Sequence, residues 1–265
     1  MPPRKPKSDY AIQTVAHALR LLEEFRELDE LGVTELSRRL NLHKNNVFRL
    51  LATLEQRGYI EQSASTERYR LGARCLALGE TFCRSHPLLH QARAVLRSLA
   101  NEVGETVHLA QMSGFEVVHL DAEVYHQPIL APSRIGERLP IHCTALGKVL
   151  LGAAPERHRE AYDRTVVAGR GLPQRTRATI ADPTKFFEEV RTAAGQGYAL
   201  DIGECEDGLS CAAAPVYDRS GLSVAALSVS GPSFRLGTDA LLRSIVPSLN
   251  AHADRLSRSL GHARD

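Results

Sequence analysis

An α+β fold in two parts is predicted for this chain of 265 residues by three observations. Residues 33–60 hold two short helical patterns on either side of a tight polar turn, and a strand-like run follows them. Beyond residue 87, strand-like runs in hairpin order alternate with amphipathic helical runs. Between the two parts, His86-Pro87 interrupts the pattern. Hairpins with helices packed outside them indicate an α+β domain with an antiparallel sheet and flanking helices.

The start of the chain is basic and proline-rich. Residues 1–9 are expected to form a flexible arm that either touches phosphate groups or is simply disordered. They lack the apolar core of a signal peptide, and no apolar run is long enough for a membrane span. A first helix is expected from about Thr14, and its buried side is expected to carry Val15, Leu19, Leu22 and Phe25.

The next two helices carry the main signal. Thr34 is expected to cap the second helix and Asn41 to end it. A third helix is expected from about His43 to Arg57. Its apolar residues recur at i, i+3, i+4 and i+7 and predict one buried stripe, formed by Val47, Leu50, Leu51 and Leu54. The opposite side holds no large aliphatic residue and carries Asn45, Arg49, Ala52 and Gln56, flanked by Asn46 and Thr53.

This is the outline of a helix-turn-helix, whose second helix fits the major groove of DNA. Asn can pair with adenine and Arg with guanine, so the exposed side has the chemistry to read bases. After Gly58, residues 59–61 and 69–71 are expected to form a hairpin whose loop, residues 62–68, is a wing. The alternative is a structural helical hairpin with a solvated polar face. The candidate DNA-contacting residues are Thr34, Lys44, Asn45, Asn46, Arg49, Thr53, Arg68 and Arg70.

The net charge and the cysteines limit the kinds of protein that this chain can be. Net charge is only +2, and residues 1–85 hold 14 Lys and Arg against 11 Asp and Glu, so the basic excess at the proposed DNA-binding end is small. Specific binding would therefore need dimeric contacts as well as charge. The five cysteines are an odd number without a Cys-x-x-Cys pair, which suits a reducing cytoplasm and indicates neither a disulfide framework nor a zinc finger. Most of them are expected to be small buried residues.

Beyond a linker helix at about 74–82, the expected elements alternate. The expected helices are 88–100, one capped by Thr144 and running to Leu151, a short one after Pro155, one from Asp182-Pro183 to about Ala194 that Gly195 and Gly197 stop, and 238–260. The expected strands are 106–111, 116–122, 129–134, 198–201, 210–217 and 222–230, with a turn at 218–221 joining the last two.

Short motifs in a fixed order run through the chain: Ala18-Leu19-Arg20-Leu21-Leu22-Glu23, Leu42-x-Lys44-x-x-Val47-x-Arg49-Leu50-Leu51, Gly58-Tyr59, Tyr69-Arg70-Leu71-Gly72, Gly104-Glu105-Thr106-Val107-His108-Leu109, Ala145-Leu146-Gly147-Lys148, Gly197-Tyr198-Ala199, Cys211-Ala212-Ala213-Ala214-Pro215-Val216 and Ala225-Ala226-Leu227-Ser228-Val229-Ser230-Gly231-Pro232. Through these motifs the chain resembles the IclR family of bacterial transcriptional regulators, from about Tyr10 to Gly261. One departure is His43-Lys44-Asn45-Asn46, which replaces a Ser/Thr-rich opening, so no operator sequence can be transferred.

The resemblance implies a regulator that binds an operator as a homodimer or homotetramer and senses a small organic or aromatic acid. A cytoplasmic location is expected from the cysteines, and no enzyme activity is expected because the sequence has no Ser-His-Asp order, phosphate loop or dinucleotide fingerprint. The resemblance also implies a winged helix-turn-helix at 10–72, a linker helix at 73–86 and a GAF-like effector-binding domain at 87–265, without a cofactor. The effector site that it implies comprises Ala145, Leu146, Asp201, Leu209, Cys211, Ser228 and Ser230.

The residues themselves allow two interpretations of that site. Ser228 and Ser230 are two apart on one strand and share a face, beside Cys211 and Asp201 on neighbouring strands. Together with the first turn of the helix at Ala145 they could hold a carboxylate. The plainer interpretation is that small residues fill a sheet and bond local backbone. Few aromatic residues are placed here, which mildly favours aliphatic acids, although Phe115, Phe186, Phe187 and Tyr198 could approach.

Three further interpretations compete. His108, His119 and His142 could join cysteines at a metal, but their spacing matches no ligand pattern, so none is expected. The acidic residues at 201–207 are expected to form a solvated loop. An enzyme could use Cys211 as nucleophile beside His142 or Asp201, although no base stands in a fixed relation to it. A constitutive DNA-binding scaffold without a ligand is the remaining alternative.

Overall fold

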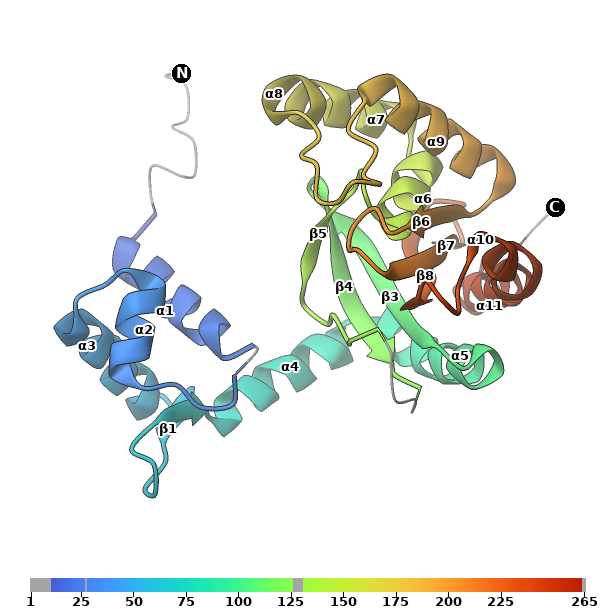
Figure 1. Cartoon of the computed structure of the whole chain (residues 1–265). Helices are drawn as coiled ribbons and strands as arrows, with labels where there is room; N and C mark the ends of the chain where they lie inside the picture. The colour runs from blue at the N-terminus through green and yellow to red at the C-terminus, as the bar shows by residue number, and fades with distance from the viewer. Residues whose placement is uncertain (1–10, 27, 126–130, 264–265) are drawn as a thin grey trace, which may run out of the picture. The chain divides into compact units, whose positions relative to one another are not determined.

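The computed structural model describes residues 11–26, 28–125 and 131–263. The predicted basic arm at 1–9 lies outside these residues. The chain divides between His86 and Pro87 into two compact units, called here the N-terminal and C-terminal units (Figure 1). In the described ranges, the helices are too short or too polar to cross a lipid bilayer.

Three helices, a two-stranded hairpin and a fourth helix follow one another in the N-terminal unit (Figure 1). Strands β1 and β2 are antiparallel, and Leu31 adds a single bridge to Tyr69. The expected winged helix-turn-helix order is therefore confirmed. The elements are α1 (Gln13–Glu23), the 3-10 turn η2 (Glu24–Arg26), α2 (Val33–Leu40), α3 (Lys44–Gln56), β1 (Ile60–Gln62), β2 (Tyr69–Leu71) and α4 (Ala73–Ser85).

One apolar cluster holds this unit together. It joins the inner sides of α1, α2, α3 and the hairpin, with Leu21, Leu36 and Leu51 fully buried. The prediction for α1 was wrong at two positions, because Val15 is 53% exposed and Leu19 56% exposed. The buried stripe of that helix instead follows Ala18, Leu21, Leu22 and Phe25, and this turns Val15 and Leu19 toward solvent.

The start of α2 also differs from the prediction. Gly32 takes the extended cap conformation (φ −90°, ψ 160°), and its carbonyl accepts from Leu36 N, so Thr34 lies inside the first turn and is not the N-cap. The predicted end is confirmed, because Asn41 is left-handed at φ 54° and ψ 46°. Gly58 is likewise left-handed at φ 75° and turns the chain from α3 into the hairpin.

The C-terminal unit is a six-stranded antiparallel sheet in the order β5-β4-β3-β8-β7-β6. Helices α5 and α11 pack on one face, and α6 packs on the other with α9 against it (Figure 1). The elements are α5 (Pro87–Val103), β3 (Thr106–Ser113), β4 (Glu116–Glu123), β5 (Arg138–Pro140), α6 (Ala145–Ala153), α7 (Glu156–Tyr162), the π-helical η3 (Asp163–Val167), α8 (Ala168–Arg170), α9 (Pro183–Gln196), β6 (Ala199–Ile202), β7 (Leu209–Tyr217), β8 (Ser223–Pro232), α10 (Thr238–Ala240), the π-helical η4 (Leu241–Ile245) and α11 (Val246–Ser259).

Capping residues and glycines in the sequence predict the bounds of several of these elements. Asp182 caps α9 by accepting from Lys185 N, and Pro183 takes the first helical position, as predicted. Gly197 ends the same helix in the left-handed region, whereas Gly195 lies inside it, so the prediction that Gly195 stops the helix was wrong. A strand at 129–134 was also wrong: residues 131–134 form none, residues 129–130 are not described, and β5 forms instead at 138–140.

Candidate functional site

Helix α3 presents a polar side to solvent. Val47 and Leu51 are fully buried and Leu50 is 8% exposed, which fixes the rotation of the helix. Asn45, Asn46 and Arg49 then lie exposed on the opposite side, as predicted from the helical wheel, and the remaining exposed positions on this side are Ala52, Thr53 and Gln56. The Thr53 hydroxyl donates to Arg49 O at 2.8 Å, and Lys44 is exposed at the first helical position.

Phe48 is a feature of this helix that the sequence interpretation left unassigned. Its side chain is 56% exposed, although it stands between buried Val47 and exposed Arg49. A helical wheel centred on the buried stripe places position 48 at the edge of the polar side, and this could have found it. An exposed aromatic ring on a helix that lies in the major groove can contact the methyl group of thymine.

The two wing arginines are held by carboxylates. Arg68 donates from Nη2 to Glu35 Oε2 at 2.8 Å and to Glu30 O at 3.0 Å. Arg70 donates from Nε to Glu61 Oε1 at 2.6 Å. Both arginine side chains remain about half exposed, so they can exchange these partners for phosphate at the cost of a surface ion pair.

In the C-terminal unit, the residues that were predicted to bind the effector lie together around one cavity. In the sheet register, Asp201 pairs with Cys211, Cys211 pairs with Ser230, and Ser228 pairs with His108. All seven residues predicted from the family resemblance line the cavity, whose volume is about 40 Å³. A volume of this size holds a few water molecules or a carboxylate group. The lining residues are His108, His119, Ala131, Arg134, Leu139, Thr144, Ala145, Leu146, Asp201, Cys205, Glu206, Leu209, Cys211, Ser228 and Ser230.

The N-terminus of α6 forms part of the wall. Thr144 caps the helix, since its Oγ1 accepts from Gly147 N at 3.1 Å and donates to Pro140 O at 2.9 Å. The N–H groups of Ala145 and Leu146 belong to the first turn and have no partner within the helix. Such groups, together with the helix dipole, favour an anion.

Asp201 and Glu204 are buried, so the prediction of a solvated loop for this acidic run was wrong for both residues. Asp201 is 4% exposed and accepts from Glu204 N at 2.7 Å, while Glu204 is paired with Lys148 of α6. Burial raises the pKa of Asp201 to about 7, with the Glu204 charge adding to the effect. Glu206 and Asp207, by contrast, are exposed as expected.

Two histidines of the cavity were seen in the sequence but not placed in the site. His108 of β3 and His119 of β4 are 1% and 3% exposed, and their ring centroids are 5.3 Å apart. Burial lowers the pKa of His108 to about 3 and that of His119 to about 4. Both rings are therefore neutral at physiological pH.

Cysteine chemistry does not offer a nucleophile here. Burial, with the charge of Asp201, holds the pKa of the Cys211 thiol well above its usual range, which disfavours the reactive thiolate. Of the five cysteines only Cys143 is buried as a residue, so the prediction that most are buried was wrong. Among the described residues, no group of three or more His, Cys, Asp or Glu side chains is arranged to hold a metal ion.

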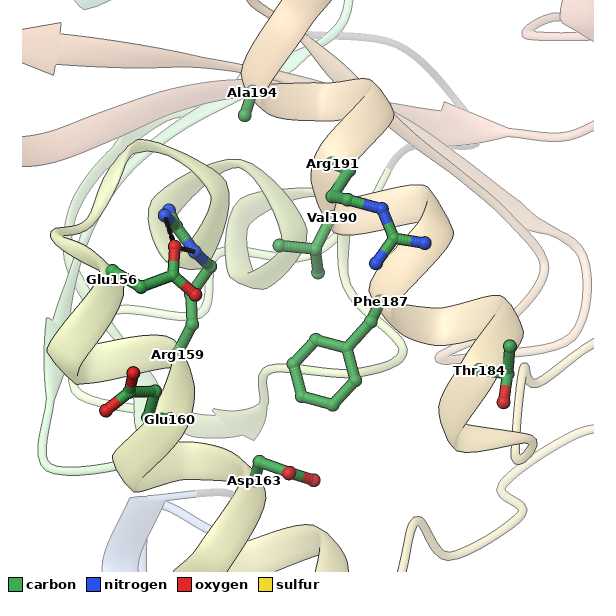
Figure 2. Close-up of a pocket in the computed structure, with 9 residues that line it drawn as sticks. All are labelled: Glu156, Arg159, Glu160, Asp163, Thr184, Phe187, Val190, Arg191 and Ala194. Atoms are coloured by element: carbon green, nitrogen blue, oxygen red, sulfur yellow. Dashed lines mark hydrogen bonds and ion pairs between the residues drawn. The ribbon is translucent and has the colours of Figure 1, made fainter.

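A larger hollow of about 540 Å³ lies elsewhere in this unit, between α7, η3 and α9. Figure 2 shows the acidic side chains Glu156, Glu160 and Asp163 along one wall, and Phe187 and Arg191 on the other. Arg159 is bonded to Glu156 and to the carbonyls of Gly152 and Ala154, so it serves the fold. None of the predicted effector-binding residues lines this hollow. We therefore place the candidate site at the smaller cavity, which all seven of them line.

Comparison with known proteins gives a consistent picture. Residues 14–64 match the model of the IclR helix-turn-helix domain, and residues 80–258 match the model described as bacterial transcriptional regulator IclR C-terminal. The HTH-type transcriptional regulator XynR of Escherichia coli is 35% identical over 95% of this chain and 98% of its own length. KdgR of the same organism is 31% identical over 97% and 95%.

Solved structures agree in fold. The IclR protein of Thermotoga maritima superposes with a TM-score of 0.79 at 28% identity, covering 95% of this chain and 100% of that one. An IclR homologue of Microbacterium hydrocarbonoxydans, solved as a complex with 4-hydroxybenzoate, superposes with a TM-score of 0.76 at 24% identity over 94% and 100%.

Proposed function

This chain belongs to the IclR family of bacterial transcriptional regulators, and from this premise we propose that a small carboxylate in the C-terminal cavity controls operator binding by α3. Like its relatives, the chain is a DNA-binding regulator and not an enzyme. What we add is the assignment of the residues and the class of effector. The seven predicted residues come from four separate stretches of chain and converge on one cavity, and this observation carries the proposal.

For the DNA, we assign base reading to Asn45, Asn46 and Arg49, which share the exposed side of α3. Lys44 and Thr53 flank them and would contact phosphates, joined by Thr34 at the start of α2 and by the wing residues Arg68 and Arg70. Because residues 1–85 carry a balance of only +3, one copy supplies few phosphate contacts. We therefore propose that a homodimer or homotetramer binds the operator, in the cytoplasm.

For the effector, the carboxylate would lie against the first-turn N–H groups of α6 and the hydroxyl groups of Ser228 and Ser230. A cavity of about 40 Å³ admits that group alone, so the rest of an organic or aromatic acid enters only when the wall moves. Binding would then favour a conformation that is minor in the free protein, which is how a ligand shifts a population between states of different DNA affinity.

The experiment is a pair of titrations on the full chain. Fluorescence anisotropy with the DNA immediately upstream of its own coding region is expected to show a specific complex. A thermal-shift screen of keto, hydroxy and aromatic acids is expected to raise the melting temperature with at least one acid, and that acid should change the DNA affinity. If no acid raises the melting temperature, the chain is a constitutive DNA-binding protein and the effector proposal fails.

A further inference from the structure

The histidine pair of the cavity presents hydrogen-bond acceptors. His108 Nε2 lies 3.2 Å from Pro132 O, and a carbonyl can only accept, so Nε2 carries the proton of the neutral ring. Its Nδ1 is then a bare lone pair. That atom is buried and has no partner among the described residues.

His119 is the second ring of the pair. The backbone carbonyl of Glu137 acts to raise the pKa of this ring, and its Nδ1 is also buried without a partner in the described part of the chain. A nearby carbonyl favours a proton on the ring, and Nδ1 has no acceptor to donate to, so we assign the proton to Nε2, which leaves Nδ1 as an acceptor. Ser228 Oγ is the third buried atom of the cavity that the described residues leave without a partner.

Buried polar atoms without a protein partner are rare in folded proteins, and each can bond a water molecule or a ligand group. Two imidazole lone pairs repel a carboxylate, so the carboxylate of a ligand belongs at α6 and the serines. The histidine end requires a donor. Both an ammonium group and a hydroxyl group can donate to these lone pairs. A hydroxyl group is neutral, so it costs less free energy to bury than an ammonium group does.

We propose that the effector is a hydroxylated carboxylic acid whose hydroxyl groups donate to Nδ1 of His108 and His119 while its carboxylate lies at the N-terminus of α6. This rests on the proposed function, since it names the effector class of the same cavity. An unsubstituted aliphatic or aromatic acid would leave both ring nitrogens unsatisfied. A site built to bond a hydroxyl group rejects the analogue that lacks it, because its own polar atoms are then left unpaired.

The test uses three-carbon acids that differ only in the substituents on C2 and C3. Propanoate, alanine, lactate and glycerate are titrated into the full chain by calorimetry. Hexanoate and gluconate form a second, longer pair. We expect lactate to bind about 10-fold more tightly than propanoate, glycerate more tightly again, and alanine no better than propanoate. Equal or tighter binding of propanoate and hexanoate than of their hydroxylated partners would overturn the inference.

The matched variants use glutamine, whose amide replaces Nε2 and its bond to the carbonyl but leaves no acceptor at the Nδ1 position. His108→Gln and His119→Gln are expected to lose the preference for lactate and to keep the affinity for propanoate. The control is His142→Gln, because His142 is as buried and contacts Pro173 O through Nε2 at 2.9 Å but does not line the cavity. It is expected to keep the preference.

The outcomes separate the two proposals. If hydroxylated and unsubstituted acids all fail to bind, the carboxylate effector itself is wrong and this inference fails with it. If acids bind without a hydroxyl preference, the hydroxylated effector is overturned and the carboxylate proposal stands. If His142→Gln removes the preference as fully as His108→Gln does, the assignment of the hydroxyl contacts to His108 and His119 is overturned. Circular dichroism of each variant checks folding. The comparison of ligands on the unmodified protein tests the hydroxyl preference even if a variant does not fold.

Discussion

Lys148 and Glu204 form a buried ion pair: Nζ lies 2.5 Å from Oε1, and the side chains are 1% and 9% exposed. Lys148 Nζ also donates to Leu200 O at 2.9 Å. The pair therefore ties α6 to the segment around β6, and these two elements supply Leu146 and Asp201 to the cavity wall. Burial is the main cause that raises the pKa of Glu204, against the charge of Lys148, which lowers it.

Replacing Lys148 by Met should destabilise the fold strongly. The substitution keeps the length of the side chain but leaves the Glu204 carboxylate buried without its partner, which costs about 3–5 kcal/mol. Urea unfolding of the two proteins measures the difference. The control is Arg138→Met, which breaks the pair with Glu116 where both side chains are about half exposed, and it should cost less than about 1 kcal/mol. Similar losses for the two variants would contradict the prediction.

The N-terminal unit could be predicted from local signals almost completely, and the cavity could not. The stripe of α3, the left-handed Asn41 and the hairpin after Gly58 each depend on residues within one or two turns of chain. The ion pair of Lys148 joins residues 56 apart, so the acidic run around Glu204 resembles a solvated loop until the fold supplies its partner.

The same distinction explains the remaining errors. His108 and His119 meet because two strands pair in one register, and sequence spacing alone does not give that register. Val15 and Leu19 have the period of a helix, yet the position of Leu21 and Phe25 decides which side faces inward. The seven cavity residues are predicted by the family motifs. The residue types alone favour the other interpretation, in which small side chains fill the sheet.

Two variants of α3 should affect DNA in different ways. Arg49→Ala should cost about 1–3 kcal/mol on the preferred sequence and relax discrimination at one base pair, because it removes the base contact that we propose for Arg49. Lys44→Ala should weaken binding evenly across sequences and reduce the salt slope by about 1. Anisotropy titrations on matched and scrambled duplexes at several salt concentrations distinguish the two. Arg97→Ala, an exposed arginine on α5, serves as control. An even loss across sequences for Arg49→Ala would show a phosphate contact instead.

Ligand binding should weaken as pH rises through 7. Asp201 lines the cavity, and its pKa of about 7 means that it is protonated below that pH and negatively charged above it. A carboxylate ligand is repelled by the ionised form, so its Kd should rise up to about 10-fold between pH 6 and 8. The pKa is raised above its unfolded value of 3.8, so folding stability also declines as pH rises from about 4 to above 7.

Asp201→Asn checks the assignment of that pH dependence. Asn stays neutral and keeps an oxygen for the bond from Glu204 N. Calorimetric titration of the variant should give a Kd that is flat over the same pH range and lower than that of the unmodified protein at pH 8. A variant that retains the full pH dependence would place the titrating group elsewhere, with Glu204 as the next carboxylate to substitute.

Two helical glycines should respond to alanine with opposite signs. In α6, a Cβ on Gly147 would lie 2.2 Å from Ile141 O and 2.4 Å from Ile141 Cα, which are backbone atoms that cannot give way. Gly147→Ala should therefore destabilise by about 3 kcal/mol or more and distort the cavity wall. In α9, a Cβ on Gly195 meets nothing within 4 Å, and the residue is exposed inside the helix. Gly195→Ala should stabilise by about 0.5–1 kcal/mol, because alanine loses less conformational freedom on folding. Urea unfolding measures both, and a stabilised Gly147→Ala would show that α6 does not approach Ile141 this closely.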